Sequence, residues 1–169
     1  MFDQAVVRIG IRYGVICGLV SFAVTLLIYF SGANPYGQTS LFSLLFMPLF
    51  VFMGCAYFKK YTDQNIGFLR ALRVALSITF YAALASAMLL YIFSTLAGFD
   101  AIQRHINEMK VMLEATRAET IKLIGEANYN QTLVQLDKTT PYHLAADDFM
   151  KKLFTGFIIS IVAAVYFRK

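Results

Sequence analysis

The alternation of hydrophobic and polar stretches along the chain predicts four membrane-spanning helices. Residues 74–99 contain no Asp, Glu, Lys, Arg or His, and a helix needs roughly 20 mainly apolar residues to cross the hydrocarbon core of a bilayer. Because backbone groups in hydrocarbon must be paired within their own segment, we expect this run to be a helix. Three other apolar runs, residues 13–30, 41–58 and 149–167, are long enough to lie beside it.

Two of these runs carry features that modify the simple picture. Pro48 lies in the middle of the second run, where we expect a kink because proline removes a backbone donor. Lys151 and Lys152 lie in the first turn of the fourth run, and we expect both side chains to reach outward to the water. Apart from them, the runs contain no Asp, Glu, Lys, Arg or His between their ends, which argues against a proton pump or a coupled transporter.

Residues 100–148 form a polar insert between the third and fourth runs. Its charged residues are eight acidic ones, Asp100, Glu108, Glu114, Glu119, Glu126, Asp137, Asp147 and Asp148, and five basic ones, Arg104, Lys110, Arg117, Lys122 and Lys138. Its apolar residues recur at helical spacing from Ile102 through Ile106 and Met109 to Leu113. This stripe predicts an amphipathic helix over residues 101–128.

The chain has to return to the membrane after that helix, and two geometries allow it. The insert is either an antiparallel hairpin that stands upright on the membrane or a helix bent down onto the membrane surface. We favour the upright hairpin, because Thr140-Pro141 is typical of a helix start and the helix that begins there can cover the apolar stripe with Tyr142 and Leu144. The charged far half would then be its exposed tip.

Composition agrees with one all-α integral membrane domain over residues 1–169. The chain is 59% hydrophobic and only 15% charged, whereas soluble domains carry about a quarter charged residues. The net charge of +5 does not indicate a nucleic-acid partner, because the basic residues collect beside the apolar runs. We therefore expect the lipid bilayer to be the main environment of the chain.

The basic residues also predict orientation, because cytoplasmic flanks are enriched in Lys and Arg. Three regions on one side of a four-span chain are basic, namely Arg8 and Arg12, then Lys59, Lys60, Arg70 and Arg73, and finally Arg168 and Lys169. The first connection, residues 31–40, has no charge. We therefore expect both termini to face the cytoplasm and residues 100–148 to face outward.

Small residues recur every four positions in three of the predicted helices and would lie on single helix faces. These are Gly10, Gly14 and Gly18 in the first helix, Ala75, Thr79, Ala83 and Ala87 in the third, and Gly156, Ser160 and Ala164 in the last. Such faces allow membrane helices to approach closely. Packing inside the four-helix bundle is the favoured interpretation, and self-association or docking on a larger membrane protein is the alternative.

Residues with metal-binding or redox chemistry are few. Cys17 lies in an apolar run, as does Cys55, so neither predicts a disulfide or a metal site. His105 and Glu108 can share a helix face, as can His143 and Asp147, but two loose pairs make a weak metal constellation. Solvated surface is the favoured interpretation, and we expect no cofactor, no metal and no catalytic residue.

The whole pattern resembles one known family. The third run and its flank read NIGFLRALRVALSITFYAALASAMLLYIF, with Phe68 and Ala71 opening the helix. The last part of the chain reads TPYHLAADDFMKKLFTGFIISIVAAVYFRK, with Gly156 among small residues and a basic end. With the Gly-rich first run, these features resemble the domain-of-unknown-function family 4199 of small four-span membrane proteins from Bacteroidetes. The resemblance implies a bacterial inner-membrane location and no established activity.

Three functions are compatible with the sequence. The first is a non-enzymatic membrane protein whose insert binds a partner or a second copy, with the stripe Ile102, Ile106, Met109 and Leu113 as the candidate partner surface. The second is a small permease or an accessory subunit of a membrane transport complex. The third is a lipid-active enzyme, which lacks a motif of acid and base residues. We favour the first.

Overall fold

The computed structural model describes residues 3–97 and 99–168. Every regular element in this part of the chain is a helix, and four helical segments are long and apolar enough to cross a membrane. They are α1 (Gln4–Phe30), the continuous pair η1 (Gln38–Leu44) and α2 (Phe46–Tyr61), α3 (Phe68–Leu96), and α7 (Pro141–Phe167). The predicted all-α fold with four potential spans is therefore confirmed, while the bilayer boundaries within these helices stay predictions.

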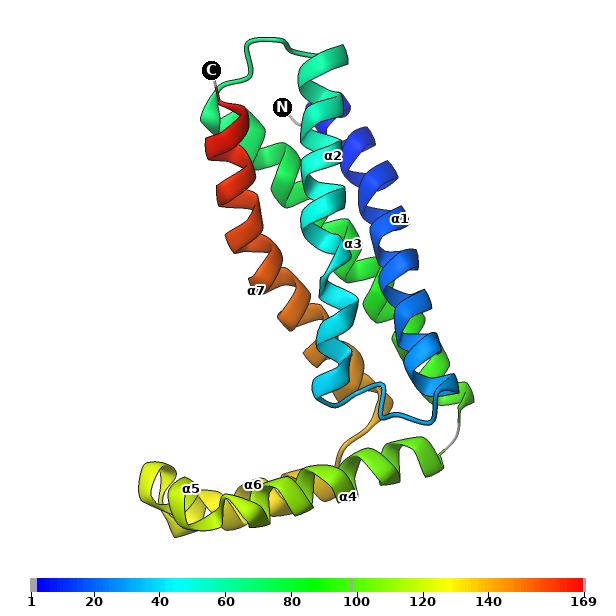
Figure 1. Ribbon diagram of the computed structural model, residues 1–169, viewed down its shortest axis with the longest axis vertical. Coiled ribbons are helices and arrows are strands. Elements are labelled where there is room, and N and C mark those ends of the chain that lie inside the picture. Colours follow the sequence, from blue (N-terminus) through cyan, green and yellow to red (C-terminus); the bar gives the residue numbers. More distant parts are fainter. Residues whose placement is uncertain (1–2, 98, 169) are drawn as a thin grey trace.

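Helix α3 is the centre of the bundle (Figure 1). Its most extensive contacts are with α1 on one side and α7 on the other, and α2 lies across the seam between these two. The buried side chains of α3 include many small ones, such as Ala71, Ala75, Ala82 and Ala83. Small side chains let neighbouring helices come close, which explains why α3 can contact three other helices at once.

The glycine face of α1 lies directly against α3. A Cβ atom added to Gly14 would lie 2.6 Å from the backbone oxygen of Ile78, and one added to Gly18 would lie 2.8 Å from that of Ala82. Gly10 faces Ser77 in the same way. These separations leave no space for a side chain, so the three glycines set the distance between α1 and α3.

The small-residue face of α7 lies on the opposite side of α3. The hydroxyl oxygens of Thr79 and Ser160 are 3.1 Å apart, and the Ser160 hydroxyl also donates a 2.6 Å hydrogen bond to the backbone oxygen of Gly156. Ala164 is fully buried one turn further along. Both small-residue faces therefore lie inside the bundle.

The second span differs from the predicted kinked helix. The chain forms a 3₁₀ helix up to Leu44 and an α-helix from Phe46, so Pro48 stands in the first turn of α2. A proline in a first turn costs no intrahelical hydrogen bond, because the N–H groups there have no partner within the helix. The prediction that Pro48 lies in the middle of an α-helix is therefore wrong.

Three shorter helices form an arm at one end of the bundle. They are α4 (Phe99–Ala115), α5 (Arg117–Ile124) and α6 (Glu126–Asp137), and we call them the arm. The predicted single helix over residues 101–128 is wrong, because the chain breaks before Arg117 and again at Gly125, whose φ of +83° suits glycine. From there α6 returns along α4, and Lys110 pairs with Asp137 at 2.5 Å.

The arm lies across the end of the bundle rather than standing upright on it (Figure 1). Ile102 and Ile106 are buried there in a cluster with Tyr36, Leu90 and Leu144. This cluster fixes the first half of α4 flat against the bundle, so the favoured upright hairpin is wrong. Leu144 covers the apolar stripe as predicted, whereas Tyr142 is exposed.

Candidate functional site

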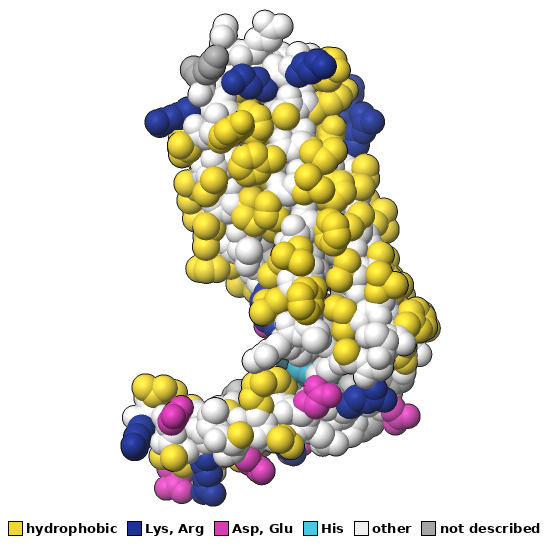
Figure 2. Space-filling view, in the orientation of Figure 1, with side chains coloured by type: hydrophobic (Ala, Val, Ile, Leu, Met, Phe, Trp, Pro, Cys, Tyr) yellow, Lys and Arg dark blue, Asp and Glu magenta, His cyan; other side chains and the backbone are white. Residues whose placement is uncertain are grey.

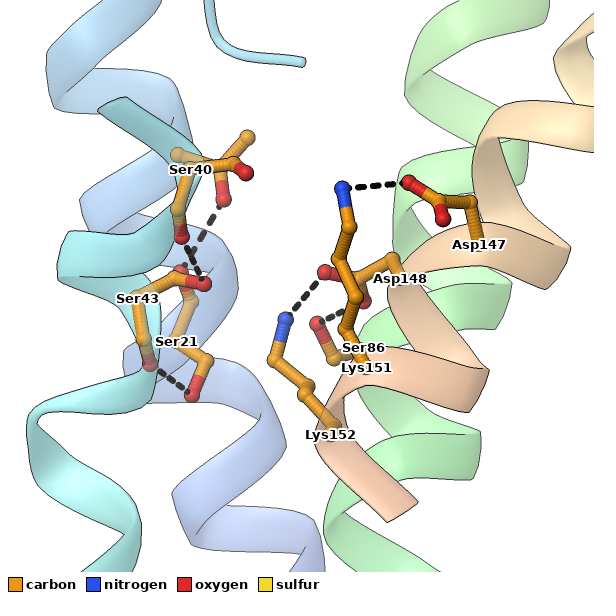
Figure 3. Close-up of polar contacts among 9 residues, drawn as sticks. Ser21, Ser40, Ser43, Ser86, Asp147, Asp148, Lys151 and Lys152 are labelled. Carbon is orange, nitrogen blue, oxygen red and sulfur yellow. Dashed lines mark hydrogen bonds and ion pairs between the residues drawn. The ribbon is translucent and has the colours of Figure 1, made fainter. Parts of the chain in front are cut away.

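The most unusual feature of the bundle is a buried ion pair between two residues of α7. Lys152 is only 1% exposed, and its Nζ donates a hydrogen bond to Oδ1 of Asp148, one turn earlier on the helix. Oδ2 of the same carboxylate accepts a 3.0 Å hydrogen bond from the hydroxyl of Ser86 on α3. Figure 3 shows Asp148 between Ser86 and Lys152, with the Lys152 side chain extending from α7 toward α1 and η1. The predicted outward reach of Lys152 to water is therefore wrong.

The ion pair lies well inside the bundle. Ser86 is about 15 Å from Leu96, the last residue of α3, at a rise of 1.5 Å per residue. The hydrocarbon core is about 30 Å thick in total, so a bilayer centred on Ala82, the midpoint of α3, would place Ser86 about 6 Å from the bilayer centre and about 9 Å below the hydrocarbon boundary on the arm side. Ionisable groups at such depth are costly and commonly mark functional sites. This pair therefore corrects the expectation that the interior of the spans carries no acidic or basic side chain.

A second ion pair, between Lys151 and Asp147, lies next to the first pair on α7. Lys151 and Asp147 are 2.5 Å apart and are both partly exposed. Between this pair and the first connection lies a cavity of about 10 Å³, whose wall includes Asp148, Tyr36 and Thr25. A cavity of that size holds about one water molecule. The Asp148 carboxylate, which is 13% exposed, therefore borders a small cavity with several polar groups in its wall.

Serine residues of α1 and η1 face the lysines from across the bundle (Figure 3). The hydroxyl of Ser21 donates a 2.9 Å hydrogen bond to the backbone oxygen of Ser43, whose own hydroxyl donates to the backbone oxygen of Ser40 at 2.7 Å. These bonds satisfy backbone carbonyls of the 3₁₀ helix η1. The serines of η1 and the lysines of α7 lie at a similar depth in the bundle (Figure 3).

The first connection is clamped to the middle of α4. Nδ2 of Asn34 donates a 2.6 Å hydrogen bond to Oε2 of Glu108 and lies 3.0 Å from Nδ1 of His105. The ring of Tyr36 packs edge-on against the His105 ring, with centroids 5.8 Å apart. With the cluster around Ile106, this clamp holds the arm at one angle to the bundle.

The His105 ring is suited to accepting a hydrogen bond from the side-chain amide of Asn34. Burial lowers the pKa of His105 below its usual value, and the charge of Lys151 lowers it further, although the nearby carboxylates of Glu108 and Asp147 raise it. A lowered pKa favours the neutral ring, whose Nδ1 can then accept the amide N–H of Asn34.

The two pairs considered for metal binding have structural contacts in the fold. His105 and Glu108 hold Asn34. Nδ1 of His143 accepts a hydrogen bond from the backbone N–H of Thr140 and caps the start of α7. Within residues 3–97 and 99–168, no group of three or more His, Cys, Asp or Glu side chains could hold a metal ion.

The candidate partner surface is divided by the fold. Ile102 and Ile106 are buried against the bundle, so these two residues are not available to a partner, whereas Met109 and Leu113 are half-buried. Large apolar side chains are instead exposed on the far part of the arm, where sequence reasoning had expected mainly charges. They are Val111, Met112, Leu123, Ile124 and Val134. We call these five residues the arm tip.

Comparison with known proteins gives one result. A family model described as "Protein of unknown function (DUF4199)" matches residues 12–169, which confirms the family expected from the sequence. No curated protein and no solved structure matches the chain significantly. The match covers α1 from Arg12 onward, the three other potential spans and the arm, so the Asp148–Lys152 pair and the clamp lie within the family's region.

Proposed function

We propose that this chain, which belongs to the DUF4199 family, is a non-enzymatic integral protein of a bacterial inner membrane. In this proposal the bundle anchors the arm, and the arm binds a partner protein at the outer surface of the membrane. The observation that carries the proposal is the arm tip. Leu123 is 85% exposed and Val111 is 67% exposed, although the arm is otherwise polar.

An exposed group of large apolar side chains is typical of an interaction site. The rest of the arm presents both signs of charge, with six acidic and five basic residues between residues 99 and 138. Helices that bind anionic lipid surfaces are instead rich in Lys and Arg on their polar face. The balanced charge therefore favours a protein partner over an anionic lipid surface.

The polar clamp supports the same proposal. Asn34, His105 and Glu108 join the first connection to α4, and Ile102 with Ile106 adds an apolar contact. A binding surface on a fixed arm loses less conformational freedom on association than one on a flexible loop. The clamp would thus hold the arm tip in position before a partner arrives.

The orientation rests on the distribution of basic residues. Figure 2 shows Lys and Arg side chains gathered at the end of the bundle opposite the arm, with hydrophobic side chains over the bundle between. The start of α1 and the end of α7 lie at that same basic end (Figure 1). Because basic flanks favour the cytoplasm, we propose cytoplasmic termini and an arm on the outer side.

The proposal is tested by photocrosslinking in cells. A photoreactive phenylalanine derivative at Leu123 should give a discrete protein adduct, and the same group at Asn107, an exposed polar position on α4, should not. Ile124→Glu should abolish the Leu123 adduct while the variant keeps its membrane level and helical content. A diffuse signal without a discrete protein adduct, or an adduct insensitive to Ile124→Glu, would refute binding through the arm tip.

A transport role is the second candidate, and the buried Asp148–Lys152 pair favours it, because ionisable groups inside membrane bundles mark ion and proton paths. In this alternative the chain is a small permease or an accessory subunit of a transport complex. Purified chain in vesicles with a trapped pH-sensitive dye separates the two. Proton flux that is lost in Asp148→Asn at unchanged helical content, and kept in Asp147→Asn, would favour transport over the binding role.

A further inference from the structure

An apolar cleft runs between α3 and α7 on the outside of the bundle. Its volume is about 440 Å³, and its lining side chains are all apolar or aromatic. They include Ala87, Met88 and Tyr91 of α3 and Tyr142 and Phe149 of α7. Binding sites for small ligands typically have volumes of about 300–1,000 Å³, so the cleft is in the range that holds a bound molecule.

The cleft is hollow because of where its small and large residues lie. Ala87 and Ala145 are buried and form its floor, whereas Met88, Tyr91 and Tyr142 are exposed and form its rim. A larger residue in place of either alanine would fill the floor. The cleft is therefore a consequence of side-chain choice and not simply of the angle between two helices.

The cleft lies in the half of the bundle nearest the arm. Its α3 residues extend from Leu84 to Ile92, a length of about 12 Å at 1.5 Å per residue. At its inner end the Phe149 ring meets the Phe80 ring edge to face, with centroids 6.2 Å apart. At its outer end stands Tyr142, in the first turn of α7, and tyrosines are enriched at membrane–water interfaces.

We propose that this cleft binds one acyl chain of a lipid from the leaflet on the arm side. One leaflet supplies about 15 Å of hydrocarbon, half of the 30 Å core, which matches a cleft of about 12 Å that ends at the Phe80–Phe149 contact. The cleft is continuous with the lipid-facing surface of α3 and α7. The proposal needs only that the four helices span a bilayer, and it is independent of what the arm binds.

A bound chain would differ from the surrounding lipid in its contacts. In the cleft it touches the alanine floor and the aromatic rim on several sides, whereas a lipid on a smooth helix face touches protein on one side only. More close contacts between apolar atoms give more dispersion energy. Binding at the cleft should therefore saturate at one lipid for each chain, whereas contact elsewhere should rise gradually with lipid concentration.

The natural absence of tryptophan from the chain allows a direct test. Met88→Trp places the only tryptophan on the rim, and Phe154→Trp places it on an exposed position of α7 that is outside the cleft lining. Both purified variants are titrated in detergent with phosphatidylcholine brominated on its acyl chains, which quenches tryptophan. The Met88→Trp signal should show a saturable component at one lipid per chain, and the Phe154→Trp signal should fall gradually.

Two filling variants complete the test in the Met88→Trp background. Ala87→Leu fills the floor from α3, and Ala146→Leu fills the cleft from α7; helix content and melting temperature identify which of them folds. The saturable component should be lost in each folded filling variant. The proposal is overturned if the two reporters quench alike, or if the saturable component survives in a folded filling variant.

Discussion

Replacing Lys152 by methionine should strongly destabilise the bundle. The side chain of Lys152 is 1% exposed and that of Asp148 is 13% exposed, so the substitution leaves a carboxylate in the interior with the Ser86 hydroxyl as its remaining side-chain donor. Removing one member of a buried ion pair costs about 3–5 kcal/mol. Two unit charges 4 Å apart attract by about 4 kcal/mol at an effective dielectric constant of 20, which is the same size.

The double variant Lys152→Met with Asp148→Asn isolates the cause of this loss. It removes both charges, so most of the lost stability should return, because replacing a whole buried pair is often close to neutral. Lys151→Met is the matched control. Its partner Asp147 is 56% exposed, and an exposed pair contributes about 1 kcal/mol or less.

Reversible unfolding in mixed detergent micelles, followed by circular dichroism, gives the free energies of unfolding for the four proteins. We expect Lys152→Met to be the least stable, with the double variant and Lys151→Met both close to the parent. If Lys152→Met loses no more stability than Lys151→Met, Lys152 reaches water at the bundle surface and the buried pair is refuted.

Three further predictions use the same unfolding assay. Gly14→Leu should lose about 1–3 kcal/mol or more through overpacking against the Ile78 backbone oxygen. Gly67→Ala has open space around it but stands at the N-cap of α3, so it should lose less than about 1 kcal/mol. The pKa of His105 is lowered on folding. Its contribution to the free energy of unfolding should therefore be complete above the unfolded pKa of about 6.5 and should fall as the pH drops through the folded pKa. A His105→Gln variant whose free energy of unfolding keeps the same dependence on pH would contradict this. Asn34→Ala should cost about 1 kcal/mol by removing the clamp and should speed hydrogen exchange in α4, and unchanged exchange would show that the clamp does not hold the arm.

The four potential spans were predictable because hydrocarbon imposes a simple requirement on sequence. Residues 74–99 have no charged side chain, and only a helix satisfies such a segment in a bilayer. The glycine face was recognisable for a similar reason, since spacing of four places Gly10, Gly14 and Gly18 on one side whatever the neighbouring helix is. That this neighbour is α3 depends on the bundle arrangement, which one sequence does not contain.

The buried ion pair was missed because charge itself was used to mark the ends of spans. That rule places Asp148 in the polar insert and lets Lys152 reach the water, although both lie inside α7. A signal was present. Residues 147–152 contain two acid–lysine pairs at a spacing of four, which allows each pair to form on one helix. Which of the two is buried depends on Ser86, which is distant in sequence.

The direction of the arm also depended on distant contacts. The spacing of the apolar stripe continues on either side of a bend and does not give the angle of the bend. The angle follows from Ile106 packing into a cluster with Tyr36 and Leu144 and from the Asn34 clamp. These partners come from two other parts of the chain, so local pattern could not supply the geometry.

Because the arm lies across the end of the bundle (Figure 1), we predict that its tip stays near the membrane surface. Energy transfer from a single tryptophan to lipids with dansyl-labelled headgroups tests it most directly, using Leu123→Trp for the tip and Tyr142→Trp for the start of α7. A crosswise arm predicts efficient transfer from both positions in vesicles. An upright arm would lift Leu123 about 36 Å from the start of α4 at 1.5 Å per residue, and transfer from Tyr142→Trp alone would contradict the account.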